Sequence, residues 1–405
     1  MVRRLVLTAL TLLILVMPAP ATATPANGSE PLGMGVTDAG VRRMQSSLVP
    51  HELRLRVAGR LRTVTLWLAE GFAVNVFADG IDSARMLAES PTGEFVVTTG
   101  WDGKVLKLTD KDRDGRADDV VPIMFGLQVP HGVVFAGDEM LVAETHRVLR
   151  LPHWWDGASA RPIIELDGGG HHATRSLAVG SDGALYVSTG STCDVCVEAD
   201  ARRAAVWRYT LDGGDGAPFA RGLRNAVGLA LDPASGHLWA TDNERKALGD
   251  EIPPDEVNVL RAGGDFGWPA CWGRQEVNPE LGSVEGCAAT EAPALELPAH
   301  SAPLGLDFVR GDAFPPAYRG GLLIALHGSA ARSEAVGYSV VFVPVVDGKP
   351  EAAHEFMRGW LVGDDSWGRP VAPFFGRDGS LYLTDDKAGA IYRVTALPTR
   401  VAAGS

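Results

Sequence analysis

The sequence predicts an all-β fold, a six-bladed β-propeller, from three observations. Glycine (48 residues) and proline (26) are abundant and only 21% of residues are charged, which favours many turns over long amphipathic helices. Apolar and polar residues alternate in short runs bounded by Gly, Pro, Asp and Ser, which is typical of half-buried strands. One arrangement of strands recurs six times, and units of about 40 to 80 residues with three or four strands suit propeller blades. A stack of β-sandwiches is the alternative, but it does not predict so regular a turn.

Each repeat contains a short apolar stretch, a turn, a second apolar stretch that ends in small polar residues, a loop and a third strand. The first two stretches fall at residues 85–100, 131–145, 175–190, 227–243, 304–329 and 370–386. The third strands are expected at residues 104–108, 147–151, 204–209, 255–260, 338–345 and 390–394. The segment LWLAEGFAVNVFADG (residues 66–80) precedes the first repeat and is expected to supply the remaining strand of the last blade, which closes the ring.

The N-terminal residues predict export. Residues 1–23 contain two arginines, an apolar run (residues 5–16) that is short for a membrane span, and the small-residue sequence ATA (residues 21–23). We expect a signal peptide that is cleaved after Ala23, a secreted or periplasmic protein and no other transmembrane segment; a buried N-terminal helix is the alternative. The remaining regions are an extension of unclear role (residues 24–66), the propeller (residues 67–396) and a flexible tail (residues 397–405).

The four cysteines stand at positions 193, 196, 271 and 287. An even number in an exported chain suggests two disulfides, and we expect local pairs, Cys193 with Cys196 and Cys271 with Cys287. The sequence STCDVC is also compatible with a redox-active CxxC or with half of a zinc site. There is no second CxxC, and no His follows Cys196 to complete a covalent haem motif.

Basic side chains are expected around one mouth of the propeller, although the formal net charge of the chain is −13. A nucleic-acid partner is not expected, because binding phosphates requires surplus Lys and Arg. The innermost strands run parallel to the central channel, so the residues just before them lie around one mouth. These positions are Arg85, His131, His172, Arg224, Asn225, Ser301 and Arg369. Three arginines and two histidines there favour an anionic ligand held by guanidinium groups; arginines scattered over the surface are the alternative.

Several separated motifs resemble one known family. They are GLRNAVGLALDP, WATDN, LGDEIPPDEVNVLRAGGDFGWPACWG, HSAPLGLDF, YRGGLLIALHGS, GYSVVFVP and WGRPV. In order and spacing they are similar to the glucose/sorbosone dehydrogenase family of quinoprotein propellers, over roughly residues 68 to 395. The likeness is strongest to the L-sorbosone dehydrogenase-like branch, where GGGHH and STCDVC also have counterparts.

The resemblance implies a central cavity that binds pyrroloquinoline quinone (PQQ) and calcium. It also implies an enzyme that oxidises sugars or related aldehydes and alcohols. The family's catalytic base falls on His172. The positions implied for cofactor binding are Arg224, Asn225, Asn243, Asp255, His327, Arg332 and Arg369. Calcium is expected on backbone carbonyls around Gly249 and Asp250. The sequence contains no haem motif or attached carrier domain, so we expect electrons to leave to a diffusible acceptor.

The chemistry of PQQ agrees with these side chains. PQQ is an ortho-quinone with three carboxylates, so it requires several cations. Substrate oxidation sends a hydride to a quinone carbonyl carbon while a base removes the hydroxyl proton, and imidazole suits that base because its unperturbed pKa is about 6.5. Calcium, bound by oxygen ligands, polarises the carbonyl. The glycines of GGGHH let the backbone lie close to a flat ring, although a plain flexible loop would have the same sequence.

The sequence departs from the family pattern at the proposed site. Ser191 stands where sugar-oxidising relatives have an aspartate that orients the base. Ala330 and Ala331 replace the usual Trp-Asn of sorbosone-type relatives, and His327 stands near the place of a lysine that reaches the cofactor in soluble glucose dehydrogenases. These differences bear on cofactor affinity and substrate range.

A second ion site is expected in DKDRDGRADD (residues 110–119). The D-x-D-x-D-G spacing of a calcium loop is formed by Asp110, Asp112, Asp114, Gly115 and Asp118, with the carbonyl of Arg116 as a further ligand. The closing Glu of an EF-hand is missing, because position twelve is Val121. An acidic hairpin loop without an ion is the alternative.

Three functions are compatible with these features. The first is a secreted PQQ-dependent dehydrogenase acting on a sugar, a sorbosone-like aldehyde or a polyol. The second is a calcium-dependent propeller lactonase or hydrolase, which would need acidic side chains that converge on the metal. The third is a non-catalytic propeller that binds glycans or a protein partner.

Overall fold

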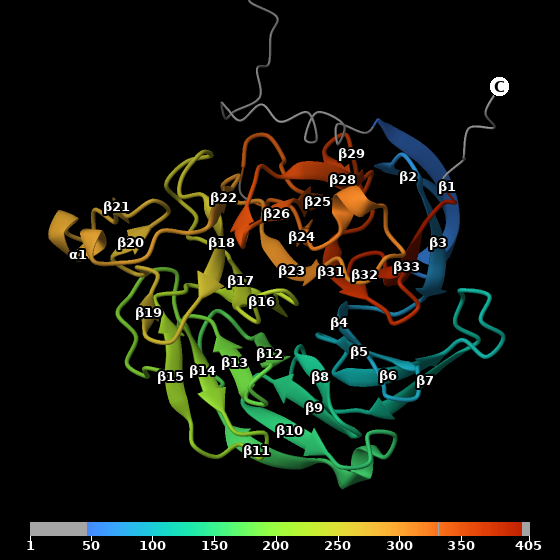
Figure 1. Cartoon of the computed structure of the whole chain (residues 1–405), viewed down its shortest axis with the longest axis horizontal. Helices are drawn as coiled ribbons and strands as arrows, with labels where there is room; N and C mark the ends of the chain where they lie inside the picture. Colours follow the sequence, from blue (N-terminus) through green and yellow to red (C-terminus); the bar gives the residue numbers. More distant parts are fainter. Residues whose placement is uncertain (1–46, 331, 399–405) are drawn as a thin grey trace, which may run out of the picture. The chain divides into compact units, whose positions relative to one another are not determined.

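The computed structural model describes residues 47–330 and 332–398, and these residues form six large sheets in a ring (Figure 1). The innermost strands are β4 (Ala84–Glu89), β8 (Val133–Ala136), β12 (Arg175–Val179), β16 (Ala226–Leu231), β23 (Pro303–Phe308) and β31 (Pro370–Phe375). Each contacts the next along the chain, and β31 also contacts β4. The ring closes after six sheets, which confirms the predicted six-bladed propeller. The expected signal peptide, residues 1–23, lies outside the described residues.

Blades 1 to 4 follow the predicted order of strands, from the channel outward. Blade 1 adds β5 (Phe95–Thr99), β6 (Lys104–Thr109) and β7 (Asp119–Met124) to β4. Blade 2 adds β9 (Glu139–Glu144), β10 (Arg147–Leu151) and β11 (Arg161–Glu165) to β8. Blade 3 adds β13 (Leu185–Thr189), β14 (Ala205–Tyr209), β15 (Ala217–Arg221) and the parallel edge β19 (Gly264–Asp265) to β12. Blade 4 adds β17 (Leu238–Asp242), β18 (Asp255–Leu260) and β22 (Leu295–Leu297) to β16.

Blades 5 and 6 both contain strands from the region before the first repeat. Blade 5 contains β23, β24 (Leu322–Leu326), β25 (Ser339–Val343) and β28 (His354–Arg358), and the hairpin β2 (Arg60–Ala69) and β1 (Leu48–Val57) extends it. Blade 6 contains β31, β32 (Leu381–Asp385), β33 (Ala390–Ala396) and β3 (Phe72–Asp79). Because β3 pairs with β33, the predicted closure of the ring by a segment before the first repeat is confirmed.

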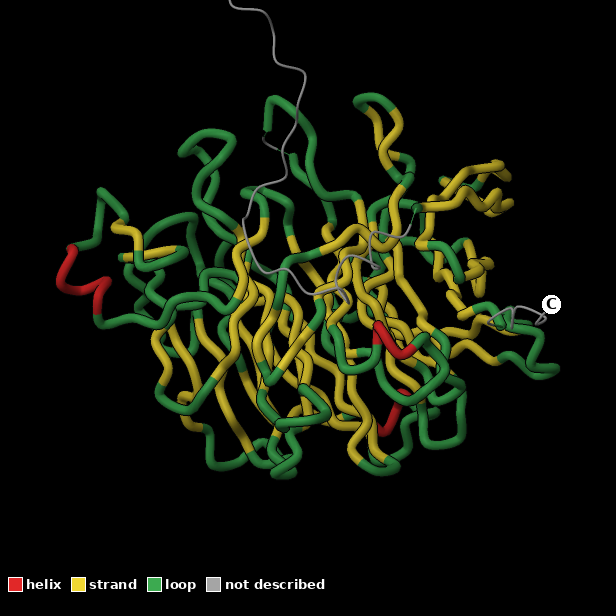
Figure 2. The backbone as a smooth tube through the Cα atoms, turned by 45° about the horizontal axis from the view of Figure 1, so that its top comes forward, coloured by secondary structure: helices red, strands yellow, loops and turns green. Residues whose placement is uncertain are grey.

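Short elements lie in the loops that join the strands (Figure 2). They are the helix α1 (Val284–Ala288), the 3₁₀ turns Gly157–Ser159 and Pro316–Tyr318, and the paired strands β20 (Cys271–Trp272) and β21 (Glu276–Val277), β26 (Val345–Val346) and β27 (Lys349–Pro350), and β29 (Leu361–Val362) and β30 (Asp365–Ser366).

Small polar residues on the second strands join neighbouring blades. The hydroxyl donors and carbonyl acceptors are Thr98 to His131 (2.7 Å), Ser188 to Ala226 (2.7 Å), Thr241 to Leu304 (2.6 Å) and Thr384 to Arg85 (2.6 Å). Each donor belongs to one blade and each acceptor to the start of the next, so the last bond joins blade 6 to blade 1. A buried hydrogen bond contributes about 1 kcal/mol net. These bonds hold the starts of the innermost strands at one level, which is where the predicted site residues stand.

Aromatic packing stabilises the junction of blades 5 and 6. The Phe72 ring of β3 lies 4.7 Å from that of Phe314 and 5.1 Å from that of Phe356, measured between centroids. All three side chains are buried. Burying a phenylalanine contributes about 1.5 to 3 kcal/mol, so β3 is held by its side chains as well as by its pairing with β33.

Candidate functional site

The residues expected around the channel mouth lie at the starts of the six innermost strands. In β4, β16, β23 and β31 the pairing with the second strand shifts within the first few residues. Such bulges bend a strand and redirect the side chains beside it. Hydrogen bonds divide the rim residues into one group around His172 and Arg224 and another around Arg85, His327 and Arg369.

His172 lies in the loop between β11 and β12 and is largely buried. Its Nδ1 lies 2.9 Å from both the carbonyl oxygen and the hydroxyl oxygen of Ser191. Burial, followed by the charge of Arg224, lowers the pKa of His172 to about 4. The imidazole is therefore neutral near pH 7 and suited to accept a proton. His171, the other histidine of GGGHH, is exposed.

Two glycines explain how this loop approaches the end of β13. Gly170 has a φ of 91°, and a Cβ there would overlap the backbone of Thr192. A Cβ on Gly190 would lie 2.6 Å from Asn225 Oδ1 and 2.7 Å from His172 Cβ. Side chains do not tolerate such contacts, so only glycine fits at either position. The glycines thus bring His172 and Asn225 together.

The guanidinium of Arg224 is buried, and four of its five N–H groups donate to protein acceptors. Its Nη1 donates to Asn243 O (2.9 Å) and Glu244 O (3.1 Å). Its Nε and Nη2 donate to Asp194 O (3.0 Å) and Oδ1 (2.7 Å). The Nδ2 of Asn243 donates to Pro303 O (2.6 Å), which ties blade 4 to blade 5. Asp194 is a partner that the sequence did not identify; its one signal is its position between two cysteines.

The second group centres on Asp386, which the sequence also missed. Its Oδ1 lies 2.9 Å from His327 Nε2, and its Oδ2 accepts from Arg85 Nη1 at 2.7 Å. Burial alone would raise the pKa of Asp386, but the hydrogen bond and charge of His327 and the charge of Arg85 lower it to about 2. Arg85 Nη2 also lies 3.2 Å from His131 Nε2. One hydrogen-bonded network at the mouth therefore contains Arg85, His131, His327 and Asp386.

Arg369 joins this network through the backbone of blade 5. Its Nε donates to His327 O (2.9 Å), its Nη2 donates to Gly328 O, and its guanidinium stands 5.3 Å from the ring centroid of Tyr338. Such cation–π contacts fix a guanidinium in place. Arg369 is thus held in one orientation at the mouth.

Asp255 connects the loops beside the first group. Its Oδ1 accepts from Glu244 N (2.9 Å), and its Oδ2 accepts from Ala302 N (2.9 Å) and Ser301 Oγ (3.2 Å). His300 and Ala302 have left-handed backbone, with φ of 65° and 55°, which is costly for residues other than glycine. The bonds to Asp255 offset part of that cost. Burial raises the pKa of Asp255 to about 6. Its Oδ2 accepts two of these bonds and its Oδ1 one, so Oδ1 retains an acceptor position.

The carbonyls expected to bind calcium already accept hydrogen bonds. Gly249 O lies 2.8 Å from His300 Nε2, and Asp250 O accepts from Arg332 Nη1. Arg332 Nη2 also donates to Glu251 Oε1 at 2.6 Å. A carbonyl oxygen has two lone pairs, so each retains one acceptor position. Calcium at these carbonyls, and contact of Arg332 with a cofactor, stay predictions.

Three buried carboxylates lie close together next to Arg224, whose Nη1 donates to the backbone of one of them, Glu244. One oxygen from each of Asp242, Glu244 and Glu256 lies within 4.8 Å of the others. Asp242 stands opposite Glu256 in the pairing of β17 with β18. Burial and mutual repulsion raise all three pKa values. The cluster could not be recognised from the sequence, because its members meet only in the fold, across the strand pair.

The acidic loop of residues 110–118 is separate from the mouth. It joins β6 to β7 at the end of blade 1 opposite Arg85. Carboxylate oxygens of Asp110, Asp112 and Asp118 lie within 4.8 Å of one another. Gly115 N donates to Asp110 Oδ2 (2.9 Å), whereas Asp114 Oδ1 accepts from Arg116 N (2.8 Å). An ion in this loop stays a prediction.

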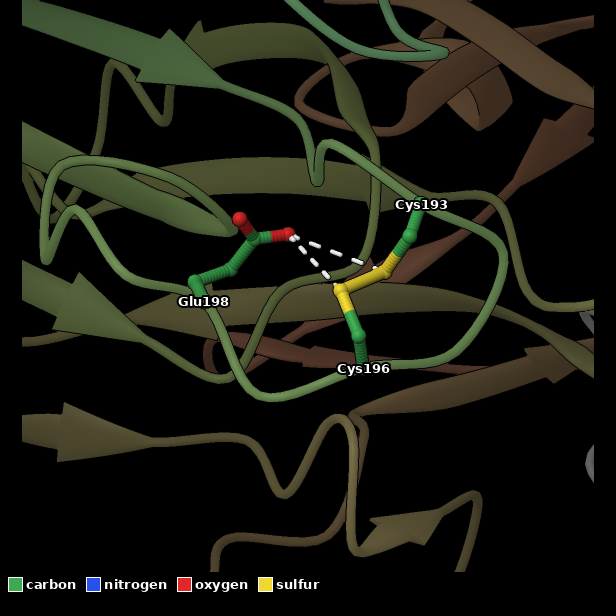
Figure 3. Close-up of side chains that lie close together, drawn as sticks. All are labelled: Cys193, Cys196 and Glu198. Carbon is green, nitrogen blue, oxygen red and sulfur yellow. Dashed lines mark hydrogen bonds between the residues drawn. A yellow bond between two sulfur atoms is a disulfide. The ribbon is translucent and has the colours of Figure 1, made fainter.

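Both expected disulfides are present, Cys193–Cys196 and Cys271–Cys287. The first closes a small loop after β13 with Glu198 beside its sulfurs (Figure 3). The second joins α1 to β20. All four cysteines are thus paired locally, as the sequence predicted.

A cavity of ≈ 380 Å³ continues along the channel below the mouth. Each blade contributes to its mainly apolar wall, through Met86, Val133, Leu177, Val227, Leu306 and Ala372 among others. Charged side chains also line this cavity, namely Glu89, Asp307, Arg310 and Arg377.

Comparison with known sequences identifies relatives. Residues 66–397 match the profile of a family described as TrAA12-like. Over 362 residues the chain is 29% identical to an uncharacterized protein of Borreliella burgdorferi, covering 84% of this chain and 93% of that protein. The aldose sugar dehydrogenase YliI of Escherichia coli is 30% identical over 122 residues, which cover 29% of this chain and 28% of that protein. Within residues 47–330 and 332–398, no helix is long and apolar enough to cross a membrane.

Solved structures share the fold. The calcium structure of the Trichoderma reesei family AA12 enzyme superimposes with a TM-score of 0.70 at 22% identity, covering 81% of this chain and 96% of that one. The holo PQQ domain of pyranose dehydrogenase from Coprinopsis cinerea gives 0.71 at 20% identity, covering 82% and 97%. Because the family match spans most of the sequence, the chain belongs to the TrAA12-like family of glucose/sorbosone dehydrogenase-like proteins.

Proposed function

We propose that this chain is an exported PQQ-dependent dehydrogenase that oxidises a sugar or a related aldehyde or polyol, with His172 as the base. One observation carries the proposal: a neutral, largely buried imidazole is fixed through Nδ1 at the same mouth as three arginines. The PQQ-containing structures of pyranose dehydrogenase and of Streptomyces coelicolor aldose sugar dehydrogenase, which share the fold, support it.

Three arginines at the mouth can contact a planar trianion. Arg85, Arg224 and Arg369 are each oriented by protein acceptors, so little side-chain freedom is lost on binding. Arg85 and Arg224 are paired with Asp386 and Asp194, whereas Arg369 has no carboxylate partner within the described residues. The backbone N–H of Asn225 donates to Asp242 Oδ1 (2.6 Å), whereas its side-chain amide has no hydrogen-bond partner within the described residues and is available to a ligand. A calcium ion would be held by the carbonyls of Gly249 and Asp250.

The roles of the residues follow from this arrangement. PQQ, when bound, would supply the acceptor for the hydride of the substrate and would pass the electrons on to a diffusible acceptor. His172 Nε2 would take the substrate's hydroxyl proton, because Nδ1 is engaged by Ser191. Arg224, Arg369 and Asn225 would hold and orient the anionic ring.

Reconstitution tests the proposal. Purified protein is titrated with PQQ and calcium, its absorbance is recorded, and dye-linked oxidation is measured on a panel of sugars, aldehydes and polyols. We expect a retained quinone chromophore and turnover, with turnover abolished and PQQ retained in His172→Ala. The exposed neighbour provides the control, His171→Ala, which should keep its rate. A protein that retains no quinone would instead be a binding propeller, and full activity in His172→Ala would disprove the base.

A calcium-dependent hydrolase is the second candidate, and the cluster of Asp242, Glu244 and Glu256 is the observation in its favour. All three carboxylates are buried, whereas the mouth of the channel carries arginines, so the acidic side chains do not line the mouth as a calcium-dependent hydrolase would require. Hydrolysis of a lactone or an ester panel with calcium and without PQQ would support this function over the first.

A further inference from the structure

The segment Ser191–Glu198 forms a compact loop directly after β13 and Gly190. The disulfide Cys193–Cys196 closes it (Figure 3). Glu198 closes it a second time, since Oε1 accepts from Thr192 N (2.7 Å) and Oε2 from Thr192 Oγ1 (2.8 Å). The disulfide and the two hydrogen bonds of Glu198 therefore restrict the conformation of this eight-residue loop.

The start of this loop holds His172. Ser191 is fully buried, and its hydroxyl donates its single proton to Cys193 O at 2.7 Å. Toward His172 Nδ1 both the hydroxyl and the carbonyl oxygen of Ser191 can therefore act only as acceptors. The proton of the neutral ring must lie on Nδ1, which leaves the lone pair on Nε2. Ser191 thus selects the tautomer that a base requires.

The middle of the same loop holds Arg224. Asp194 accepts from Nε through its carbonyl oxygen and from Nη2 through Oδ1, at 3.0 and 2.7 Å. These bonds define the plane of the guanidinium, because they engage two of its nitrogens. Asp194 lies between the two cysteines, so the disulfide fixes the backbone on both sides of it.

Resting on the proposed function, we infer that the disulfide-closed loop positions the base and a cofactor-binding arginine together, with Ser191 and Asp194 as the positioning residues. His172 and Arg224 come from different blades, and only this loop contacts both through side-chain hydrogen bonds among the described residues. Opening the loop disturbs both contacts at once, whereas loss of either positioning side chain disturbs one.

The tautomer of His172 tests the first half without any cofactor. ¹⁵N NMR of the apoprotein at pH 7 should show His172 protonated on Nδ1. Removing the Cys193–Cys196 bond by Cys193→Ala with Cys196→Ala should shift the ring toward a mixture of tautomers, because both acceptors on Ser191 are displaced. Ser191→Ala removes only the hydroxyl and should cause a smaller shift, because the carbonyl of residue 191 still accepts from Nδ1. Ser191→Thr keeps a hydroxyl and should restore the signal. Ser188→Ala, which removes another buried hydroxyl of blade 3, should leave it unchanged.

The second half is tested by PQQ affinity and turnover. We expect Asp194→Asn to weaken PQQ binding about tenfold, since its charged bond to Arg224 is lost, and Ser191→Ala to lower kcat about tenfold with KM unchanged. The cysteine pair variant should show both losses. Removing the other disulfide, by Cys271→Ala with Cys287→Ala, is the matched control and should show neither.

Each outcome decides the inference separately from the proposed function. A wild-type His172 signal in the Cys193/Cys196 variant, or equal effects from the Cys271/Cys287 variant, would overturn the positioning role. Failure of the wild-type protein to bind PQQ would refute the proposed function, while the tautomer experiment would still support or overturn the role of the loop toward His172.

Discussion

Acidification should destabilise the fold through His172. The pKa of this ring is about 4 in the folded chain, where burial opposes its charged form, and about 6.5 in an unfolded chain. At pH 7.5 the ring is neutral in both states. At pH 5 the unfolded state binds about one proton at this position and the folded state almost none, which by linkage costs about 2 kcal/mol of folding free energy.

A paired measurement isolates this contribution. Urea unfolding of the apoprotein at pH 7.5 and 5 is compared between wild type and His172→Gln, so that the titrations common to both proteins cancel. The wild type should lose about 2 kcal/mol more than the variant between the two pH values. In the reconstituted enzyme, kcat/KM should then stay level from pH 8 to 5, since the base remains neutral. Equal losses in the two proteins, or an NMR titration midpoint of His172 near 6.5, would refute the buried, neutral base.

Three further changes test other features of the structure. Gly190→Ala places a Cβ against His172 and Asn225, and should cost about 1 to 3 kcal/mol of stability and weaken PQQ binding. The control Gly214→Ala, whose Cβ would have its nearest contact at 3.2 Å, should have neither effect; calorimetry measures the stability and absorbance titration the binding. The buried acidic cluster should destabilise the wild type when the pH rises from 5 to 8, because its carboxyl groups have higher pKa values in the folded than in the unfolded state and stability falls as they lose their protons. Glu256→Gln should reduce this loss in urea unfolding, and the same dependence of stability on pH in the variant would contradict the prediction. Thr241→Val removes the hydroxyl bond to the next blade and the acceptor of Gly228 N, and should cost about 2 kcal/mol in thermal unfolding without altering the tautomer of His172. No change in stability would show that these bonds are not needed.

The fold could be predicted because its signals are local and repeated. The turn after the innermost strand and the alternation on both sides of it fall within 15 to 17 residues in five of the repeats, and within residues 304–329 in the looser fifth. The six copies reinforce one another. The closing strand was predicted because the last repeat lacked one. Both disulfides were predicted because their partners are near in sequence, three and sixteen positions apart. The hairpin of β1 and β2 carries no such repeat, so its pairing with β28 could not be anticipated.

The contacts that complete the site are not local, and the sequence could not supply them. Arg85 and Asp386 are 301 positions apart and meet because the ring closes. Arg224 and Asp194 are 30 positions apart and meet because two blades are adjacent. Residue types at the mouth could be listed from the repeat, whereas their partners depend on loop conformation. Ser191 illustrates the difference: its position was noted as a departure, but its two bonds to His172 appear only in the structure.

The identity of residue 191 has a physical consequence for the base. A carboxylate beside Nδ1 would stabilise the imidazolium and raise the pKa of His172, so the ring would lose its neutral form at a higher pH. Serine fixes the same nitrogen without adding charge. The carboxylate of Asp194 in the same loop is compensated by Arg224 at 2.7 Å, and that of Glu198 accepts from Thr192. The ring therefore keeps an available lone pair in mild acid, and an imidazolium formed in the proposed reaction would receive less electrostatic support. Replacing the neutral partner by Ser191→Asp should move the His172 titration to higher pH, and an unmoved midpoint would show that the charge of residue 191 does not act on the base.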